Sequence, residues 1–417
     1  MEFKREEFLN RLIRKKHNGL IKVITGIRRC GKSYLLFSLF KRYLLNEGIP
    51  ESHIIEIAFD SFENKKYRDP EVLYPYIKSL LKDNDMYYIF LDEVQLLAEF
   101  ESVLNGLLRV GNADIYVTGS NAKFLSKDII TEFRGRGDEL HIAPLSFCEF
   151  MEGYEGDKYD GWHEYILYGG LPPVVLLPSA EQKMELLKNL FEETYINDIV
   201  GRHRIRNRAE FEELINILAS GIGSLTNPRK LARTFKSVKQ VSISSNTIKS
   251  YLDYLSDAFL INAAMRYDIR GRKYIDTPLK YYFTDIGLRN VTIQFRQIEE
   301  THIMENIIYN ELCMRGFNVD VGIVNICQRD KGGKVVRKKL EVDFVCNKGF
   351  RRYYIQSAFS MPNREKTEQE QRSLLLAGDN FKKIIIIKDS PAVWYTEEGV
   401  MVMNIYDFLL DKNSLEG

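Results

Sequence analysis

One short stretch near the N-terminus restricts the possible fold more than any other. Gly26 is followed by four residues and then by Gly31, Lys32 and Ser33, which is the spacing G-x-x-x-x-G-K-[ST] of a phosphate-binding loop. The apolar run at residues 20–25 is typical of a buried strand, and the apolar residues after Ser33 recur at helical spacing. A loop in this context predicts nucleoside triphosphate binding. The alternative is an ordinary glycine-rich turn.

The positions of this loop have expected roles. The glycines let backbone N–H groups point inward, and the helix N-terminus adds partial positive charge. Lys32 is expected to bridge the β- and γ-phosphates of ATP, and Ser33 to bind Mg²⁺ through its hydroxyl. The predicted nucleotide-binding residues are Gly26, Ile27, Arg28, Arg29, Cys30, Gly31, Lys32, Ser33 and Tyr34.

A second motif, YYIFLDEVQ at residues 87–95, places two carboxylates at the end of an apolar run. Adjacent carboxylates at the end of a buried strand are costly unless a cation meets them. Beside a phosphate-binding loop, Asp92 is expected to hold Mg²⁺, and Glu93 to orient and deprotonate the attacking water. The alternative is a strand that ends in a solvated loop.

The first part of the chain alternates predicted strands with predicted helices. Helical spacing occurs at residues 3–16, 33–48, 72–81 and 100–110, and further apolar runs occur at 54–59 and 114–119. This alternation predicts an α/β fold with a parallel sheet, whose ligands lie at the carboxyl ends of the strands.

Three polar residues after the last of these strands are candidate catalytic groups. Asn121 is expected to contact the γ-phosphate or the attacking water, or to cap the helix that follows. Arg134 and Arg136 are candidate arginine fingers, acting on the nucleotide of the same chain or of a neighbouring subunit. The alternative for the arginines is an ordinary surface loop.

Composition and charge favour a soluble globular protein of several domains. The 417 residues are 45% hydrophobic and 28% charged, and 59 Lys and Arg nearly balance 58 Asp and Glu. Any affinity for nucleic acid must therefore come from a local cluster of charge. The five scattered cysteines form no C-x-x-C pair, and no apolar run approaches the length of a membrane span. We therefore expect a cytoplasmic protein without membrane association.

The phosphate-binding loop and the segments LDEVQ, TGSNAKFLS, FRGRGDE and PLSFCEF, in this order, resemble the AAA+ ATPases of prokaryotes. Over its whole length the chain is similar to a family of bacterial and archaeal ATPases. In that family an AAA+ core precedes a winged-helix segment and a restriction-endonuclease-like domain. The resemblance implies an AAA+ core at 1–150, a helical lid at 151–205, a winged-helix domain at 206–290 and an endonuclease-like α/β domain at 291–417.

The residues of the third part also predict a winged helix. Helices are expected at 209–219, 228–236 and 247–259, followed by two hairpin strands at 263–275 and 279–285. The third helix and the hairpin are expected to present polar and basic side chains to double-stranded DNA. These are Ser245, Asn246, Lys249, Ser250, Arg266, Arg270, Arg272 and Lys273. The alternative is a winged helix that makes only protein contacts.

In residues 291–417, the resemblance implies a metal site that keeps two of its expected residues and lacks the other two. Glu305 and Asp343 match two acidic positions, but Gln356 stands where a further acid would be, and Ala358 stands where a lysine would be. We expect a retained scaffold without cleavage. Lys348 or Lys366 could replace the missing lysine.

The sequence thus predicts an ATPase that uses ATP and Mg²⁺, with double-stranded DNA as its partner. Two alternatives stay open. One is an ATP-dependent regulatory switch acting on a protein partner, and the other is an ATP-gated, metal-dependent nuclease. A homo-oligomer is compatible with all three.

Overall fold

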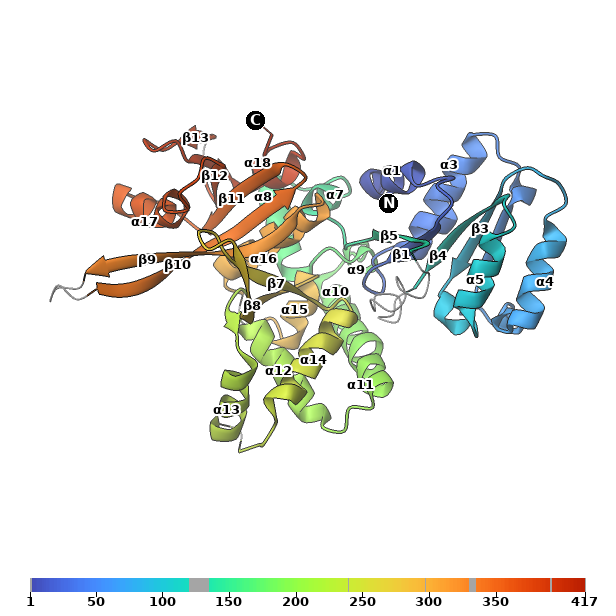
Figure 1. Ribbon diagram of the computed structural model, residues 1–417, viewed down its shortest axis with the longest axis horizontal. Helices are drawn as coiled ribbons and strands as arrows, with labels where there is room; N and C mark the ends of the chain where they lie inside the picture. Colours follow the sequence, from blue (N-terminus) through green and yellow to red (C-terminus); the bar gives the residue numbers. More distant parts are fainter. Residues whose placement is uncertain are drawn as a thin grey trace. The chain divides into compact units, whose positions relative to one another are not determined.

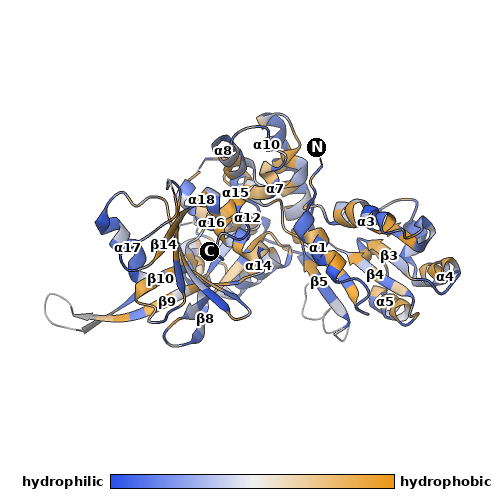
Figure 2. Ribbon diagram, turned by 90° about the horizontal axis from the view of Figure 1, so that it is seen from above, coloured by the Kyte–Doolittle hydropathy of each residue, from blue (hydrophilic) through white to orange (hydrophobic). Residues whose placement is uncertain are grey.

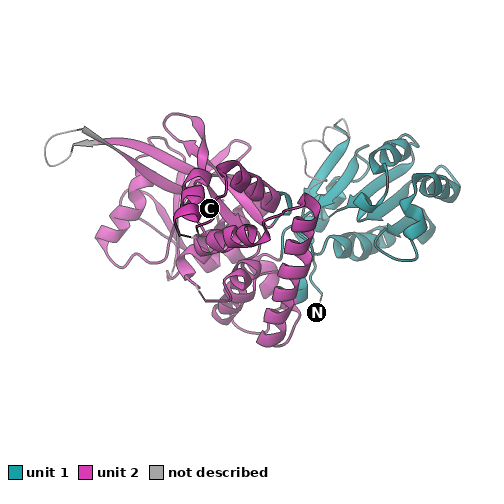
Figure 3. Cartoon of the chain, turned by 90° about the horizontal axis from the view of Figure 1, so that it is seen from below, with its two compact units in different colours: residues 1–144, 171–173, 257–259 teal, residues 145–170, 174–256, 260–417 magenta. Residues whose placement is uncertain are grey.

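The computed structural model describes residues 2–119, 135–238, 240–296, 298–329, 335–390 and 392–416. The chain forms two compact units (Figure 3). Unit 1 holds Met1–Pro144 together with Leu171–Pro173 and Asp257–Phe259, and unit 2 holds the rest. Within the described residues, no helix combines the length and the apolar character needed to cross a membrane.

Unit 1 is built on a parallel sheet with the strand order β2-β3-β4-β1-β5 (Figure 1). The strands are β1 (Ile21–Thr25), β2 (Ile54–Ala58), β3 (Tyr87–Asp92), β4 (Ala113–Thr118) and β5 (Gly137–His141). The helices are α1 (Glu6–Arg14), α2 (Lys32–Tyr34), η1 (Leu35–Phe40), α3 (Lys41–Asn46), η2 (Glu51–His53), η3 (Lys65–Arg68), α4 (Pro70–Leu80), η4 (Val94–Leu96) and α5 (Phe100–Leu108). The alternation predicted from the sequence is confirmed for β1 to β4 and for the main helices, whereas β5 was not predicted.

Both faces of this sheet are covered, because side chains of a strand point alternately to its two faces. On β3, Ile89 and Leu91 join the apolar cluster formed with α4 and α5. Phe90 points the other way, and its ring lies 5.7 Å from the ring of Phe40 on η1. The strands β3 and β4 are accordingly dominated by hydrophobic residues (Figure 2). A strand buried on both faces reads as the continuous apolar run seen in the sequence.

The order of the strands determines which side chains meet at the carboxyl edge of the sheet. β4 lies between β1 and β3, with Thr118 opposite Ile24 of β1 and Val117 opposite Leu91 of β3. The last residue of β4 therefore lies between the start of the phosphate-binding loop and Asp92.

Unit 2 contains a nine-stranded mixed sheet with the order β13-β14-β12-β11-β10-β9-β7-β8-β6. The strands are β6 (Leu225–Thr226), β7 (Ile261–Asp268), β8 (Lys273–Phe283), β9 (Asn318–Arg329), β10 (Val335–Lys348), β11 (Arg351–Ala358), β12 (Lys382–Ile387), β13 (Trp394–Tyr395) and β14 (Met401–Asn404). The helical elements are α7 (Phe147–Met151), α8 (Lys158–Tyr168), α9 (Pro172–Val175), α10 (Ala180–Asn189), η6 (Leu190–Ile196), α11 (Asn197–His203), α12 (Arg208–Ser220), α13 (Pro228–Val238), α14 (Ser245–Asp257), α15 (Ile286–Thr292), α16 (Glu300–Met314), α17 (Arg364–Leu375) and α18 (Ile405–Leu410).

The predicted hairpin exists, but its first strand was predicted too long. β7 ends at Asp268 and β8 begins at Lys273, so the turn falls inside the predicted strand 263–275. The carboxylate of Asp268 accepts a hydrogen bond of 2.9 Å from the backbone N–H of Gly271. This side chain thus stabilises a turn. The turn was not predicted because apolar residues recur on both sides of it, as they do along a continuous strand.

The hairpin is part of the large sheet, because β7 pairs in parallel with β9. Gly322 of β9 lies opposite Tyr267, and a Cβ atom at Gly322 would come within 2.8 Å of the Ile269 and Val345 side chains. This close approach requires glycine.

The segments predicted as a lid and as a winged helix pack together in unit 2. The amide of Asn290 donates to the carbonyl oxygens of Ile166 and Leu167, at 2.8 and 2.9 Å. The carboxylate of Asp285 caps α15 and also accepts the backbone N–H of Gly170 at 2.8 Å. The limits predicted at residues 205 and 290 therefore fall within one compact unit.

Candidate functional site

The phosphate-binding loop leaves the carboxyl end of β1 and enters the helical segment that begins at Lys32. Gly26 has a φ of +142°, and a Cβ atom there would lie 2.2 Å from the carbonyl oxygen of Ile142. Gly31 has a φ of +100°. Both backbone conformations favour glycine, so the two glycines of the motif occupy the positions that need them.

The side chain of Lys32 lies within the loop rather than in solvent. The residue is 5% exposed, and its ammonium donates to the carbonyl oxygens of Gly26 and Ile27 at 3.0 and 3.1 Å. A positive charge is thus held at the N-terminus of a helix, where backbone N–H groups also favour an anion.

Asp92, the last residue of β3, is buried beside this loop. Its carboxylate accepts a hydrogen bond from the Thr118 hydroxyl and is hydrogen-bonded to the Ser33 side chain. Burial raises the pKa of Asp92, whereas the hydroxyls of Thr118 and Ser33 act in the opposite direction. Glu93 and Asp60 add repulsion that also raises this pKa. A cation would relieve both the burial and the repulsion.

Glu93 follows in a left-handed conformation, with a φ of +51°. Its backbone N–H donates to the Thr118 hydroxyl at 3.2 Å, and its carboxylate accepts a hydrogen bond from the Gln95 amide. Thr118 therefore contacts both acidic residues. The roles of Thr118 and Gln95 were not predicted from the sequence, although Thr118 ends an apolar strand and thus lies at the edge where ligands bind.

The remaining predicted site residues have different outcomes. Asn121 and Arg134 lie outside the described residues. Ile27 and Cys30 are buried in the loop, and Arg28 and Arg29 lie between them. The hydroxyl of Tyr34 donates to the Glu2 carboxylate at 2.5 Å. The structure thus places Tyr34 in contact with the N-terminal segment.

Arg136 lies at the opposite edge of the sheet from the loop. It directly precedes β5, its carbonyl accepts the N–H of Ile21 at 2.8 Å, and its guanidinium donates to Asn105 at 3.1 Å. The five residues of β1 separate Ile21 from the loop by about 16 Å. This distance is incompatible with a finger acting on the nucleotide of the same chain. Action on a neighbouring subunit's nucleotide stays a prediction.

The residues present fit a nucleotide with a divalent cation. The glycine positions keep the loop backbone open, Lys32 supplies a cation, and Ser33 and Asp92 supply oxygen ligands of the kind that Mg²⁺ prefers. The donor set is therefore compatible with a triphosphate.

A second cluster of charged residues lies in unit 2, where Glu305 and Asp343 were predicted to share a site. The ammonium of Lys280, on β8, lies 2.9 Å from Glu305, 2.8 Å from Glu341 and 3.9 Å from Asp343. The Tyr282 hydroxyl also donates to Glu305, at 2.6 Å. The three carboxylates thus surround a lysine that is only 4% exposed.

The charges in this cluster are mutually dependent. Burial opposes the charged form of Lys280, but Glu305, Asp343 and Glu341 outweigh it and raise the pKa of this lysine. Burial and the neighbouring Glu305 raise the pKa of Asp343 to about 8. Lys280 therefore stays charged and offsets part of the negative charge that would otherwise attract a metal ion.

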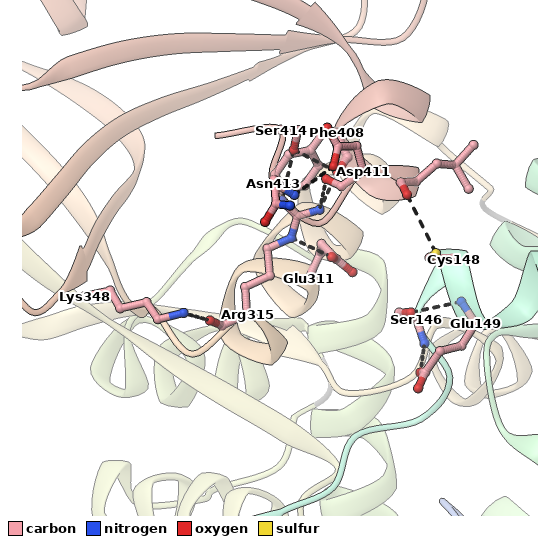
Figure 4. Close-up of polar contacts among 11 residues, drawn as sticks. Ser146, Cys148, Glu149, Glu311, Arg315, Lys348, Phe408, Asp411, Asn413 and Ser414 are labelled. Atoms are coloured by element: carbon pink, nitrogen blue, oxygen red, sulfur yellow. Dashed lines mark hydrogen bonds and ion pairs between the residues drawn. The ribbon is translucent and has the colours of Figure 1, made fainter. Parts of the chain in front are cut away.

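The lysines proposed from the sequence do not reach this cluster. Lys348 donates to the carbonyl oxygen of Arg315 at 2.6 Å (Figure 4), and Lys366 pairs with Glu370 at 2.5 Å. The expectation that either lysine replaces the missing one is therefore wrong. Lys280 was missed because it precedes the predicted domain in the sequence, and only the β7–β9 pairing brings it there.

Gln356 and Ala358, which stand where the resemblance implies an acid and a lysine, contribute little to this cluster. The side-chain oxygen of Gln356 accepts long hydrogen bonds of 3.4 Å from the Asp343 N–H and the Ser373 hydroxyl. Ala358 packs into an apolar cluster.

We expect purified protein to leave supercoiled plasmid intact with Mg²⁺ or Mn²⁺, with or without ATP. Cleavage needs an activated water and compensation of charge on the phosphate, whereas Lys280 is already committed to three carboxylates. Gel electrophoresis of plasmid measures this, with Asp343→Ala as the control for contaminating nuclease. Nicking by the wild-type protein that disappears in Asp343→Ala would contradict the expectation.

Comparisons with known proteins agree with this site. A family model described as an AAA domain matches residues 18–151, and one described as a domain of unknown function matches residues 159–299. Solved structures of the Aeropyrum pernix ORC1 protein in complex with DNA and of AMPPCP-bound DnaA from Aquifex aeolicus are only distantly similar. The ORC1 protein is 12% identical, and the match covers 70% of this chain and 93% of that chain with a TM-score of 0.29. DnaA is 15% identical, and the match covers 61% of this chain and 87% of that chain with a TM-score of 0.31.

Two relatives match most of the chain. An uncharacterized protein of Haemophilus influenzae is 34% identical over 415 residues, which are 97% of this chain and 98% of that protein. The uncharacterized protein MJ1544 of Methanocaldococcus jannaschii is 31% identical over 343 residues, covering 78% of this chain and 71% of that protein. The chain therefore belongs to the family of these two proteins, and its N-terminal part is an AAA domain with a P-loop α/β fold.

Proposed function

We propose that this protein binds ATP with Mg²⁺ at the P-loop of unit 1 and hydrolyses it. One observation carries the proposal: the hydroxyls of Ser33 and Thr118 meet the buried carboxylate of Asp92 beside the loop that holds Lys32. A triphosphate site needs an ammonium, a hydroxyl and a carboxylate at one edge of a sheet.

Each of these groups has a distinct role in the proposed reaction. The loop N–H groups and Lys32 bind the phosphates, which requires the ammonium to exchange its two carbonyl partners for phosphate oxygens. Ser33 and Asp92 hold Mg²⁺, which neutralises charge on the phosphates when bound. Glu93 takes the proton of the attacking water, and Gln95 and Thr118 keep the glutamate in position. Asn121 orients the water or the γ-phosphate.

Arginines from a neighbouring subunit would complete this site. Arg136 cannot reach the nucleotide of its own chain, so we propose that Arg134 or Arg136 acts across a subunit boundary in a homo-oligomer.

The direct test is phosphate release from ATP by purified protein, with Mg²⁺ or with EDTA, and with or without duplex DNA. We expect Mg²⁺-dependent turnover that DNA stimulates. Turnover without any effect of DNA would favour the alternative of a regulatory switch acting on a protein partner. The absence of ATP binding would contradict the proposal itself.

A specific surface favours double-stranded DNA as the partner. Helix α13 contains no acidic residue, and its exposed side chains include Arg229, Lys230, Arg233 and Lys236. Asn246 and Lys249 are exposed on α14, the helix predicted to enter the groove. The order α12, β6, α13, α14, β7, β8, with β8 pairing both β6 and β7, is compatible with a winged helix. Arg266, in contrast, is buried in the sheet and was wrongly predicted to contact phosphates.

We expect duplex binding that weakens steeply with salt, because each phosphate contact releases counterions, with a slope of about −0.9 per contact. Charge reversal of Arg229, Lys230 and Arg233 should remove most of the affinity, as measured by fluorescence anisotropy. Reversal of Lys65, Lys66 and Lys78, exposed lysines of unit 1, makes the same change in net charge and should have little effect. Equal losses in the two triple variants would show that net charge, and not α13, determines binding.

A further inference from the structure

A pocket of about 730 Å³ lies in unit 2, away from both sites described above. Three short segments line it: the turn between β7 and β8, the turn between β10 and β11, and residues 377–381 after α17. We call it the three-turn pocket. Its volume lies within the range of about 300–1,000 Å³ of small-molecule sites.

The walls of the three-turn pocket are strongly basic. Arg270, Arg272, Arg351 and Arg352 line it, and Asp379 is the one acidic residue among its described lining residues. The carboxylate of Asp379 already accepts the Tyr354 hydroxyl at 2.6 Å. The pocket therefore favours an anionic ligand.

Two of these arginines have donors to spare. Among the described residues, the guanidinium of Arg270 donates only through its Nε–H, to the carbonyl oxygen of Leu376 at 2.9 Å. The guanidinium of Arg272 is exposed and has no partner within the part of the chain that the structure describes. Arg351 pairs with Glu416, and Arg352 donates to Asn347. A planar fork of free N–H donors matches the oxygens of a phosphate.

The pocket also offers aromatic faces. Phe350, at the tip of the β10–β11 turn, is fully exposed, and Phe381 on the opposite segment is 40% exposed. The guanidinium of Arg352 lies 5.2 Å from the ring centroid of Phe381 and 5.5 Å from that of Tyr267. Exposed rings and a stacked guanidinium are surfaces on which nucleobases stack.

We propose that the three-turn pocket binds single-stranded nucleic acid, with phosphates on Arg270 and Arg272 and a base on Phe350. In a duplex the base faces are hidden within the stack, so only unpaired bases can use an exposed ring. An acidic peptide would satisfy the arginines but would leave Phe350 in water. The proposal deepens the proposed association with DNA, which concerns α13 and α14, by adding a second site with a different ligand.

The test compares two probes by fluorescence anisotropy, a short labelled oligothymidylate and a duplex, in the absence of ATP. Phe350→Ala should weaken binding of the single strand by about 5- to 100-fold and leave duplex binding unchanged. Because Phe350 makes no buried contact, its truncation should leave folding intact. Phe62→Ala, which removes an exposed phenylalanine of unit 1, is the matched control and should change neither affinity.

A second variant tests the phosphate contact separately from stacking. Arg272→Gln should lower the salt dependence of single-strand binding by about 0.7 in the slope of log Kobs against log salt. The charge reversal of Arg229, Lys230 and Arg233 should weaken duplex binding and leave the single strand bound.

Three outcomes would overturn the proposal, and each can be recognised. Single-strand binding that neither Phe350→Ala nor Arg272→Gln weakens would place the single-strand site elsewhere on the protein. Displacement of the oligothymidylate by AMP at a concentration similar to that of the oligonucleotide would identify a mononucleotide site instead. Duplex binding with no single-strand binding would contradict this proposal alone. Single-strand binding by a wild-type protein that does not bind the duplex would support this proposal and contradict the proposed role of α13 and α14.

Discussion

Replacing Lys32 with alanine is expected to reduce ATP turnover by roughly 10²–10³ or more, because it removes a preorganised positive charge aimed at the phosphates. ATP affinity should also fall, by about tenfold to a hundredfold, since a hydrogen bond to a charged group is lost. Phosphate release measures turnover, and titration with a fluorescent ATP analogue measures affinity.

Stability needs to be measured on the same variant. The ammonium of Lys32 occupies the carbonyl oxygens of Gly26 and Ile27, which lose these partners in the variant. Thermal unfolding of unit 1 shows whether the loop is still folded, and Lys78→Ala, at an exposed helical position, is the matched control. A folded Lys32→Ala protein that hydrolyses ATP at the wild-type rate would refute the proposed function.

Glu93→Gln is expected to separate binding from chemistry. The amide keeps the size of the side chain and much of its hydrogen bonding, but it cannot take a proton from water. ATP should bind with nearly unchanged affinity while hydrolysis falls by roughly 10² or more. Single-turnover measurement of phosphate release is the suitable assay.

A variant of Gln95, which contacts Glu93, provides a comparison in which the expected loss of turnover is smaller. Gln95→Ala leaves the base in place but removes a hydrogen bond that orients its carboxylate, so we expect a smaller loss of turnover than in Glu93→Gln. Unchanged turnover in Glu93→Gln would move the role of the base to another residue, with Asp92 as the next candidate.

Much of unit 1 could be predicted from the sequence because its signals are local. The loop, the strand before it and the Asp92–Glu93 pair each occupy a few consecutive residues, and the strands are continuous apolar runs. The contact of Thr118 with Asp92 could not be read in the same way. It depends on β4 lying between β1 and β3, which is a property of strand order.

The charged cluster of unit 2 shows the same limit more strongly. Glu305 and Asp343 were recognised from their positions, but the lysine between them comes from β8, 25 residues before Glu305. Nothing in the local pattern around Lys280 distinguishes it from a surface lysine of the hairpin. Its burial follows from the parallel pairing of β7 with β9, which joins segments distant in the sequence.

The position of β8 has a consequence for how the chain unfolds. The same strand forms the hairpin of the predicted winged helix and carries the ammonium that lies between Glu305, Glu341 and Asp343. A fragment that ends at residue 290 would leave one side of β7 as an unpaired edge and would leave Lys280 without the carboxylates of α16 and β10. We therefore expect the helices before residue 290 and the sheet that continues after it to unfold together in a single transition.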